Sequence, residues 1–325
     1  MGERREENAR LGMEAAGMAG IAALVGYTGF VGSNLWATGA FNRGYNSQNI
    51  READGTRPDL LVYAGLRAEK YLANQAPEKD LALIQEAEEN IRRMDPRRLV
   101  LISTIDVFKT PKGVDEGSEI ETEGLHPYGY DRYLLEKWVR ERYPEALIVR
   151  LPGLFGRNIK KNFIYDYLNV IPFMLKEEKL LELATREPGL KENYTLQENG
   201  FYRLEAKDSR EELKGMFRRA GFSALNFTDS RSRYQFYDLS RLWQDIQTAL
   251  GAGLRIWHPA TEPISAGELY HYLTGEDFVN ELPGSPAEYD YRTRHAELFG
   301  GRDGYISDKK QVMQQIKDFV AEAGN

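Results

Sequence analysis

The chain has 325 residues, of which 42% are hydrophobic and 29% are charged, as in a folded chain of one large or two modest domains. The formal net charge of -7 argues against a general nucleic-acid binder, which would show a basic excess. No stretch reaches the roughly 20 apolar residues of a membrane helix, and the absence of cysteine excludes disulfides, thiolate metal sites and cysteine nucleophiles.

Residues 1–19 are predicted to form a mobile tail. They are charged and lack the apolar region of a signal peptide, so we expect a cytoplasmic protein with no membrane or nucleic-acid partner.

The first half of the chain alternates between strands and helices. Continuous apolar runs predict strands buried on both faces at 21–25, 60–63, 99–102 and 147–149. Helical patterns lie between them, starting near Gly29 and covering 79–94 and 131–143. This alternation predicts βαβ units and a parallel, doubly wound α/β sheet.

The second half has a different texture. Residues 176–233 are dense in charge with few strand signals, which predicts a helical excursion or lid. Further along, 232–250 reads as a strand leading into a long helix and 253–260 as a buried strand. Two more helices are expected at 265–275 and 308–324.

Gly26, Gly29 and Gly32 give a GxxGxxG spacing directly after the first strand and at the start of a helix. The first glycine permits a tight turn, the second removes a side chain where a pyrophosphate would approach, and the third allows close helix packing. The helix N-terminus would offer free N–H groups to phosphates. The loop predicts a dinucleotide site, and a plain tight turn is the alternative.

The sequence leaves NAD versus NADP open. An acidic residue at the end of the next strand would normally bind the ribose, but Asn46 stands in that region. Arg43 and Arg51 are cations that would suit a 2′-phosphate, although we favour the reading that both are simply solvated.

Several segments in order resemble the extended short-chain dehydrogenase/reductases, the NAD-dependent epimerase/dehydratase family of nucleotide-sugar enzymes. The resemblance covers most of residues 20–275 and rests on six segments: "GYTGFVGSNL", "DLLVYAGLRA", "VLISTIDVF", "HPYGYDRYLLEKWV", "IVRLPGLFG" and "RYQFYDLSRL".

The resemblance implies a Rossmann-type doubly wound parallel sheet with a smaller, discontinuous C-terminal α/β cap. The expected domains are an NAD(P)-binding domain over 20–175 plus 234–262 and a substrate-binding cap over 176–233 plus 263–325. It also implies the dinucleotide contacts, namely Gly26, Thr28, Gly29, Phe30, Val31, Gly32, Asn46, Ala64, Gly65, Ser103 and Pro152.

The resemblance makes Thr104 the hydroxyl that binds the reacting oxygen and Tyr128 the acid/base tyrosine. A phenol has a reference pKa of about 10, so a nearby cation must favour its ionised form before it acts as a base. The family carries lysine four residues after the tyrosine, whereas this chain has Arg132. Because the planar guanidinium is bulkier than an ammonium, the exchange is not conservative.

A second YxxxK spacing exists at Tyr133 and Lys137, on one helix face. The surrounding "PYG" and "EK" place the family register on Tyr128, so we expect Tyr133 to be a half-buried helix aromatic.

For substrate, the resemblance implies that Asn162 and Arg233 hold a diphosphate, with Arg231 as a second cation. The four histidines show no metal-type pair, so no metal site is expected. Family members often dimerise through helices beside the sheet, which leaves a homodimer through 131–143 as an alternative.

The expected function is an NAD(P)-dependent epimerase or reductase of a nucleotide-activated sugar. Dehydratases of the family commonly carry Asp-Glu after the threonine, whereas Ile105 and Asp106 follow Thr104 here. Two alternatives stay open: a non-catalytic dinucleotide-binding sensor or scaffold, and a reductase of a small carbonyl compound that carries no nucleotide.

Overall fold

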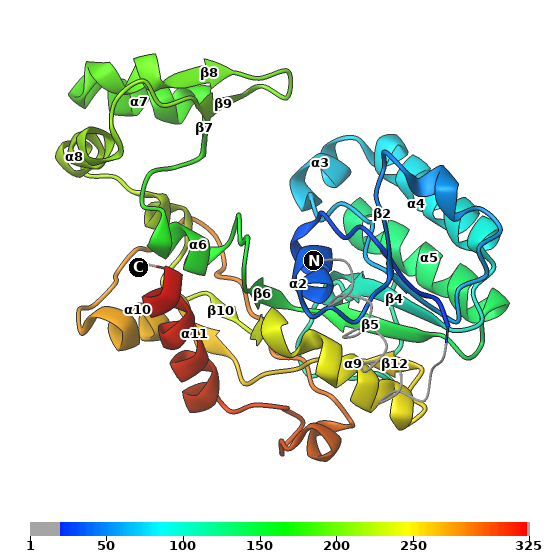
Figure 1. Cartoon of the computed structure of the whole chain (residues 1–325). Helices are drawn as coiled ribbons and strands as arrows, with labels where there is room; N and C mark the ends of the chain where they lie inside the picture. The colour runs from blue at the N-terminus through cyan, green and yellow to red at the C-terminus, as the bar shows by residue number, and fades with distance from the viewer. Residues whose placement is uncertain (1–19, 324–325) are drawn as a thin grey trace. The chain divides into compact units, whose positions relative to one another are not determined.

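The computed structural model describes residues 20–323, and the predicted tail lies outside this range. The described chain forms two compact units, each made of separated stretches (Figure 1). The first unit comprises residues 20–159, 233–264 and 288–315, and the second comprises 160–232, 265–287 and 316–323.

The first unit is built on a parallel sheet. Within the described residues the sheet has six strands in the spatial order β12–β5–β4–β3–β1–β2, namely β1 (Ala22–Val25), β2 (Arg43–Tyr45), β3 (Leu60–Tyr63), β4 (Leu99–Thr104), β5 (Leu147–Leu151) and β12 (Ile256–Trp257). β1 lies between β2 and β3, so the chain passes from β1 to β2 on one side and then crosses back to β3 on the other side. This reversal is the switch point at which parallel α/β sheets bind ligands.

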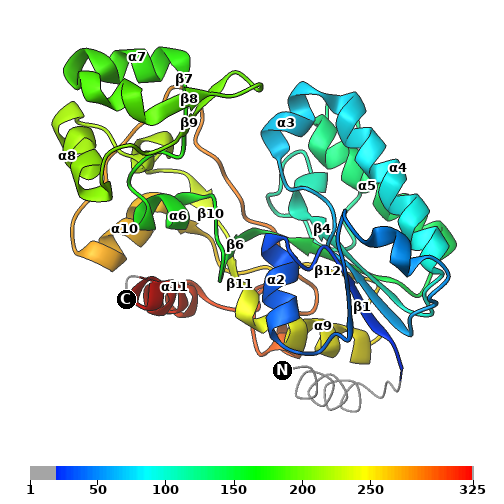
Figure 2. The same ribbon diagram turned by 45° about the horizontal axis from the view of Figure 1, so that its top comes forward.

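Side chains of the strands alternate between two apolar cores. Helices cover both faces of the sheet, which is doubly wound as predicted (Figure 2). One face, with Leu24 of β1, packs against α2 (Phe30–Ala37) and α9 (Leu242–Gly251). The other face, with Val25, packs against α4 (Pro77–Met94) and α5 (Pro127–Arg142). Further helices and strands of this unit are α3 (Lys70–Gln75), β6 (Gly153–Phe155), β10 (Arg233–Tyr234) and β11 (Phe236–Asp238), and β13 (Ile264–Ser265), which pairs with β10, begins in it.

A buried charge network joins α5 to the carboxyl ends of two strands. The Glu136 carboxylate of α5 is fully buried and pairs with Arg150 of β5 at 2.7 Å. Ser103, the register partner of Arg150 on β4, donates its hydroxyl proton to Glu136 Oε1 at 2.6 Å. Since an unpaired buried charge is strongly destabilising, these three residues fix α5 on the two strands.

The same network determines the state of His258, which directly follows β12. Arginine can only donate, so Nη1 of Arg150 donates to Nε2 of His258 at 3.2 Å. The ring proton is therefore on Nδ1, which donates to the carbonyl of Arg292 at 3.1 Å. Burial lowers the pKa of His258 to about 4, so the ring stays neutral at physiological pH.

The Glu116 carboxylate attaches the C-terminal stretch 288–315 to the sheet unit. It accepts the N–H groups of His258 and Arg294, each at 2.9 Å, and the hydroxyl proton of Thr293 at 2.6 Å. These contacts explain why this stretch lies with the sheet, whereas the predicted domains placed it in the cap.

The second unit has its own apolar core. Ile171 and Leu175 pack there with Leu180 and Phe217, so residues 160–175 belong to this unit and not to the predicted sheet domain. Its elements are α6 (Phe163–Leu168), β7 (Met174–Lys176), α7 (Glu177–Arg186), β8 (Tyr194–Leu196), β9 (Phe201–Leu204), α8 (Arg210–Ala220) and α10 (Ala266–Thr274), while α11 (Lys309–Ala323) begins in the first unit.

The expectation of a helical excursion at 176–233 was wrong in one respect. The region contains helices, but it also forms an antiparallel sheet in the order β7–β9–β8. Asn199 and Gly200 stand in the turn between β8 and β9, and Gly200 has φ 78°. Asn-Gly between apolar runs is a hairpin signal that the sequence already contained.

No helix within residues 20–323 is long and apolar enough to cross a membrane.

Replacing Glu136 by glutamine should destabilise the protein by about 3–5 kcal/mol, because Arg150 would stay buried without a charge partner. Urea unfolding monitored by circular dichroism measures this loss. Glu145→Gln is the control, since the Glu145 side chain is 77% exposed and pairs with Arg255 at the surface; its effect should stay below about 1 kcal/mol. Equal losses in the two variants would contradict the role given to Glu136.

Candidate functional site

The glycine loop connects β1 to α2 at the switch point of the sheet. Gly26 has φ 84°, and a Cβ there would lie 2.4 Å from the carbonyl oxygen of Ala64. A Cβ on Gly32 would lie 2.0 Å from the carbonyl oxygen of Gly26. Both positions therefore require glycine, the first for its backbone conformation and the third for close packing of α2.

The second glycine differs from the other two. Gly29 is exposed, and the one atom near its added Cβ would be the Gly26 oxygen at 3.2 Å. Gly29 is also the N-cap of α2, where no side chain caps the helix and no acidic residue stands in the first turn. The first N–H groups of α2 thus have neither a side-chain acceptor nor a repelling carboxylate, which suits a phosphate.

Other predicted dinucleotide contacts surround this loop. The Ala64 N–H donates to the Val25 carbonyl at 2.9 Å, so the loop after β3 lies against the end of β1. Thr28 is exposed, and Phe30 and Val31 are half-buried. A Cβ on Gly65 would lie 2.9 Å from Cγ1 of Val25, so this position also needs a small residue.

Asn46 lies directly after β2, but its own loop uses its polar groups. Its N–H donates to the Asn49 side chain at 2.8 Å, and its side-chain oxygen accepts the Gln48 N–H at 2.9 Å. Arg43 is exposed and donates to the Asn42 carbonyl at 2.9 Å. Neither arrangement distinguishes NAD from NADP.

Thr104 and Tyr128 meet where β4 ends and α5 begins. A Cβ on Gly129 would lie 2.1 Å from the carbonyl oxygen of Asp106, so the glycine of "PYG" lets the start of α5 approach the turn after Thr104. Tyr128 is 7% exposed, and burial raises its pKa against the lowering effects of the Arg132 charge and of the nearby Thr104 side chain. The predicted pair is thus brought together.

Arg132 lies against Tyr128, and its guanidinium carbon is 3.9 Å from the centre of the phenol ring. The guanidinium is buried and has other partners: it forms an ion pair with Asp80 of α4 and donates to the carbonyl of Arg67 at 2.6 Å. Arg132 therefore bridges two helices and the loop after β3, which the spacing alone did not predict.

A further polar cluster adjoins Tyr128 and was not predicted from the sequence. Asp106 accepts the hydroxyl proton of Tyr289 at 3.0 Å and pairs with Lys70 at 3.1 Å. Burial and the charge of Lys70 together lower the pKa of His126, the N-cap of α5. These residues come from distant parts of the chain, so no local spacing could have joined them.

Four further residues of this unit were singled out from the sequence, and the structure places each of them. The Ser103 hydroxyl is buried on Glu136, and Pro152 is half-buried between β5 and β6. Tyr133 is half-buried in an apolar cluster while Lys137 is exposed, as expected for a helix aromatic beside a surface lysine.

The predicted diphosphate residues are divided between the units. Arg233 is exposed in the first unit, whereas Asn162 and Arg231 lie in the second. The Asn162 side chain caps α6 by accepting the N–H groups of Ile164 and Tyr165, at 3.0 and 3.2 Å.

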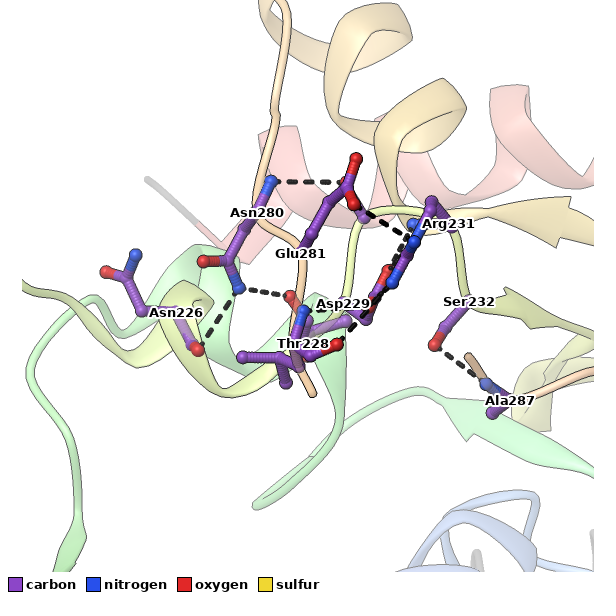
Figure 3. A network of polar contacts seen from close by, with 10 residues as sticks. Asn226, Thr228, Asp229, Arg231, Ser232, Asn280, Glu281 and Ala287 are labelled. Carbon is purple, nitrogen blue, oxygen red and sulfur yellow. Dashed lines mark hydrogen bonds and ion pairs between the residues drawn. The ribbon is translucent and has the colours of Figure 1, made fainter. Parts of the chain in front are cut away.

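Arg231 is already neutralised by two carboxylates (Figure 3). Its guanidinium pairs with Asp229 at 2.7 Å and with Glu281 at 3.0 Å. Asp229 also accepts the Leu282 N–H at 2.9 Å, and the Arg231 pairing lowers its pKa strongly. A diphosphate at Arg231 would therefore compete with these two acids.

No family model and no curated relative matches the chain. Solved structures do match in fold. A dTDP-4-dehydrorhamnose reductase from Bacillus anthracis str. Ames, in complex with NADP, has 16% identity and a TM-score of 0.60 over 94% of this chain and 99% of that one. A UDP-N-acetylglucosamine 4-epimerase from Methanobrevibacter ruminantium M1 has 10% identity and a TM-score of 0.60, over 93% and 97%.

A short-chain dehydrogenase/reductase superfamily protein from Agrobacterium tumefaciens with bound NAD has 16% identity and a TM-score of 0.56, over 93% and 96%. These likenesses confirm the expected Rossmann-type fold.

Alanine at Gly32 or Gly129 should each destabilise the protein by about 1–3 kcal/mol, because a Cβ would meet a backbone oxygen that cannot move freely. Gly251→Ala is the matched control: it also lies in a helix, and nothing lies within 4 Å of its added Cβ. We expect that control to be neutral or slightly stabilising in urea unfolding. Equal stability of all three variants would contradict the close approaches.

Proposed function

We propose that the protein is an NAD(P)-dependent epimerase or reductase acting on a nucleotide-activated sugar. The observation that carries the proposal is the pairing of Thr104 with Tyr128 in the same unit as an uncapped, glycine-lined helix start. Two of the proteins with this fold, a dTDP-sugar reductase and a UDP-sugar epimerase, support the substrate class.

The fit to a dinucleotide rests on features of the chain itself. Gly29 leaves room beside the N–H groups of Phe30 and Val31, which would hold the pyrophosphate. Ala64 and Gly65 form the neighbouring wall of the switch point. A bound nicotinamide would donate or accept the hydride.

The protein's own residues handle the proton. Thr104 orients the reacting oxygen of the sugar, and Tyr128 exchanges a proton with that oxygen. The cation against the phenol ring is Arg132, which holds the ring in place. Asn162, Arg231 and Arg233 stay proposals for the diphosphate, and Arg231 would first have to exchange its carboxylate partners.

One observation favours a second candidate. Because Arg132 is held by Asp80, it is not a free cation for ionising Tyr128. A dinucleotide-binding sensor without turnover would tolerate this arrangement.

Thermal unfolding with NAD, NADH, NADP or NADPH, each with a panel of nucleotide-diphosphate sugars, should show a cofactor shift that one sugar nucleotide increases, because only ligands of the native state stabilise it. Tyr128→Phe should keep the cofactor shift and lose about 10²-fold or more in turnover. Tyr130→Phe, on the exposed side of α5, is the control and should keep full turnover.

A complete lack of any dinucleotide shift would refute the cofactor assignment. A shift without turnover in the unmodified protein would favour the sensor.

A further inference from the structure

Three charged side chains are buried together next to Tyr128. Asp80 of α4 is 5% exposed, and Asp131 and Arg132 of α5 are 4% and 2% exposed. The ion pair between Asp80 and Arg132 uses one carboxylate to neutralise one cation. Asp131 is a second buried carboxyl group, and no residue within 20–323 forms an ion pair with it.

The surroundings of Asp131 favour a proton shared with Asp80. The two carboxyl groups interact, and oxygen Oδ2 of Asp131 is buried without a hydrogen-bond partner among the described residues. Two carboxylates contain only acceptors, so a hydrogen bond between them needs a proton on one. Burial and this neighbour raise the pKa of Asp131 to about 6.

We propose that Asp80 and Asp131 cancel the charge of Arg132, so that Arg132 positions the ring of Tyr128 without ionising it and Tyr128 acts as the proton donor of a carbonyl reduction. This inference rests on the proposed function and selects the reductase within it. Asp80, Asp131 and Arg132 are positioning residues, because they act through Tyr128.

The summed charge of Asp80, Asp131 and Arg132 supports a neutralised Arg132 at every pH near neutrality. With the shared proton the three side chains sum to zero, and without it they sum to minus one, so the cluster is never a net cation. The other charged or titratable groups around Tyr128 are Asp106, whose charge opposes ionisation, Lys70 and Tyr289, which both bind Asp106, and His126.

A phenol that keeps its proton suits the reduction of a carbonyl group, because it can donate that proton to the carbonyl oxygen. The carbonyl carbon gains hydride from the reduced dinucleotide, and the carbonyl oxygen gains the proton of Tyr128. The product is an alcohol, and the phenolate left on Tyr128 regains a proton from water. Alcohol oxidation would instead start from the phenolate, which the neutralised Arg132 does not favour.

The shared proton is tested on the protein without cofactor. Because its folded pKa lies above the unfolded value of about 3.8, Asp131 stabilises the fold at low pH, and this stability is lost as pH rises through about 6. Asp131→Asn cannot ionise, and its amide can donate to Asp80. The folding equilibrium of this variant relative to wild type should therefore increase by about a hundredfold between about pH 4 and pH 7.

The quantity to compare across pH is the difference in unfolding free energy between the variant and the wild type. His258 titrates in the same window with the opposite sign, since its depressed pKa makes stability fall as pH falls through about 4. Glu141→Gln, at an exposed position of α5, is the matched control and should give a constant difference. A constant difference for Asp131→Asn as well would overturn the shared proton.

The state of Tyr128 is measured separately by alkaline absorbance titration. Subtracting the Tyr128→Phe titration from that of wild type isolates one phenol among the 19 tyrosines. We expect no tyrosinate at Tyr128 below about pH 10, and a lower midpoint in Asp80→Asn, where Arg132 loses its partner. Tyrosinate in the wild type near neutral pH would overturn the proposal.

If Asp80→Asn does not fold, Asp131→Asn serves in the same titration, and its neutral cluster should also lower the midpoint relative to wild type. None of these readouts needs a ligand, so they can fail while dinucleotide binding and turnover persist. Conversely, a lack of dinucleotide binding would refute the proposed function while leaving the proton count intact.

Discussion

The Glu136 carboxylate is the interaction on which the geometry of the first unit depends. It lies fully buried between α5 and two adjacent strands, and it accepts hydrogen bonds from Arg150 and Ser103, which face each other in the register of β4 and β5. An uncompensated buried charge costs several kcal/mol, so α5 cannot shift along the sheet without breaking these contacts. Thr104 follows Ser103, and Tyr128 precedes Glu136 by about two helical turns. The pair proposed for chemistry is therefore held in place by residues that take no part in it.

The exchange of lysine for arginine at position 132 makes sense in the same terms. A lysine would place a compact charge beside the phenol, whereas the guanidinium fork can satisfy Asp80 and the Arg67 carbonyl while its face rests on the ring. Arginine at this position therefore connects α5 to α4 and to the loop after β3, whereas a lysine would mainly supply a charge beside the phenol. By the family motif alone, Arg132 replaces an expected lysine. By its contacts, it belongs to a cluster with Asp80 and Asp131 that carries no net positive charge.

Much of the sheet unit could be predicted, because strands buried on both faces and the glycine loop leave strong local patterns. The register of "PYG" was informative for the same reason, since Gly129 is required by a backbone contact. What the sequence did not reveal depends on pairing over long distances: Asp106 with Tyr289, Arg132 with Asp80, and Glu116 with Thr293. The hairpin at Asn199 and Gly200 is a different kind of omission, because its local signal was present and was outweighed by the surrounding charge.

The repeated passage of the chain between the two compact units has a consequence for cleavage. Each unit is assembled from separated stretches, with crossings at residues 159–160, 232–233, 264–265, 287–288 and 315–316. After a protease cut at residues 232–233, each of the two fragments still contributes stretches to both units. Residues 160–232, for instance, keep their own core around Leu180 and Phe217. They also stay bound to residues from beyond the cut, because the Asn280 amide donates to the Thr228 carbonyl and the Leu282 N–H donates to Asp229. The nicked chain would thus behave as a noncovalent assembly of complementary fragments, and neither unit corresponds to a contiguous gene segment.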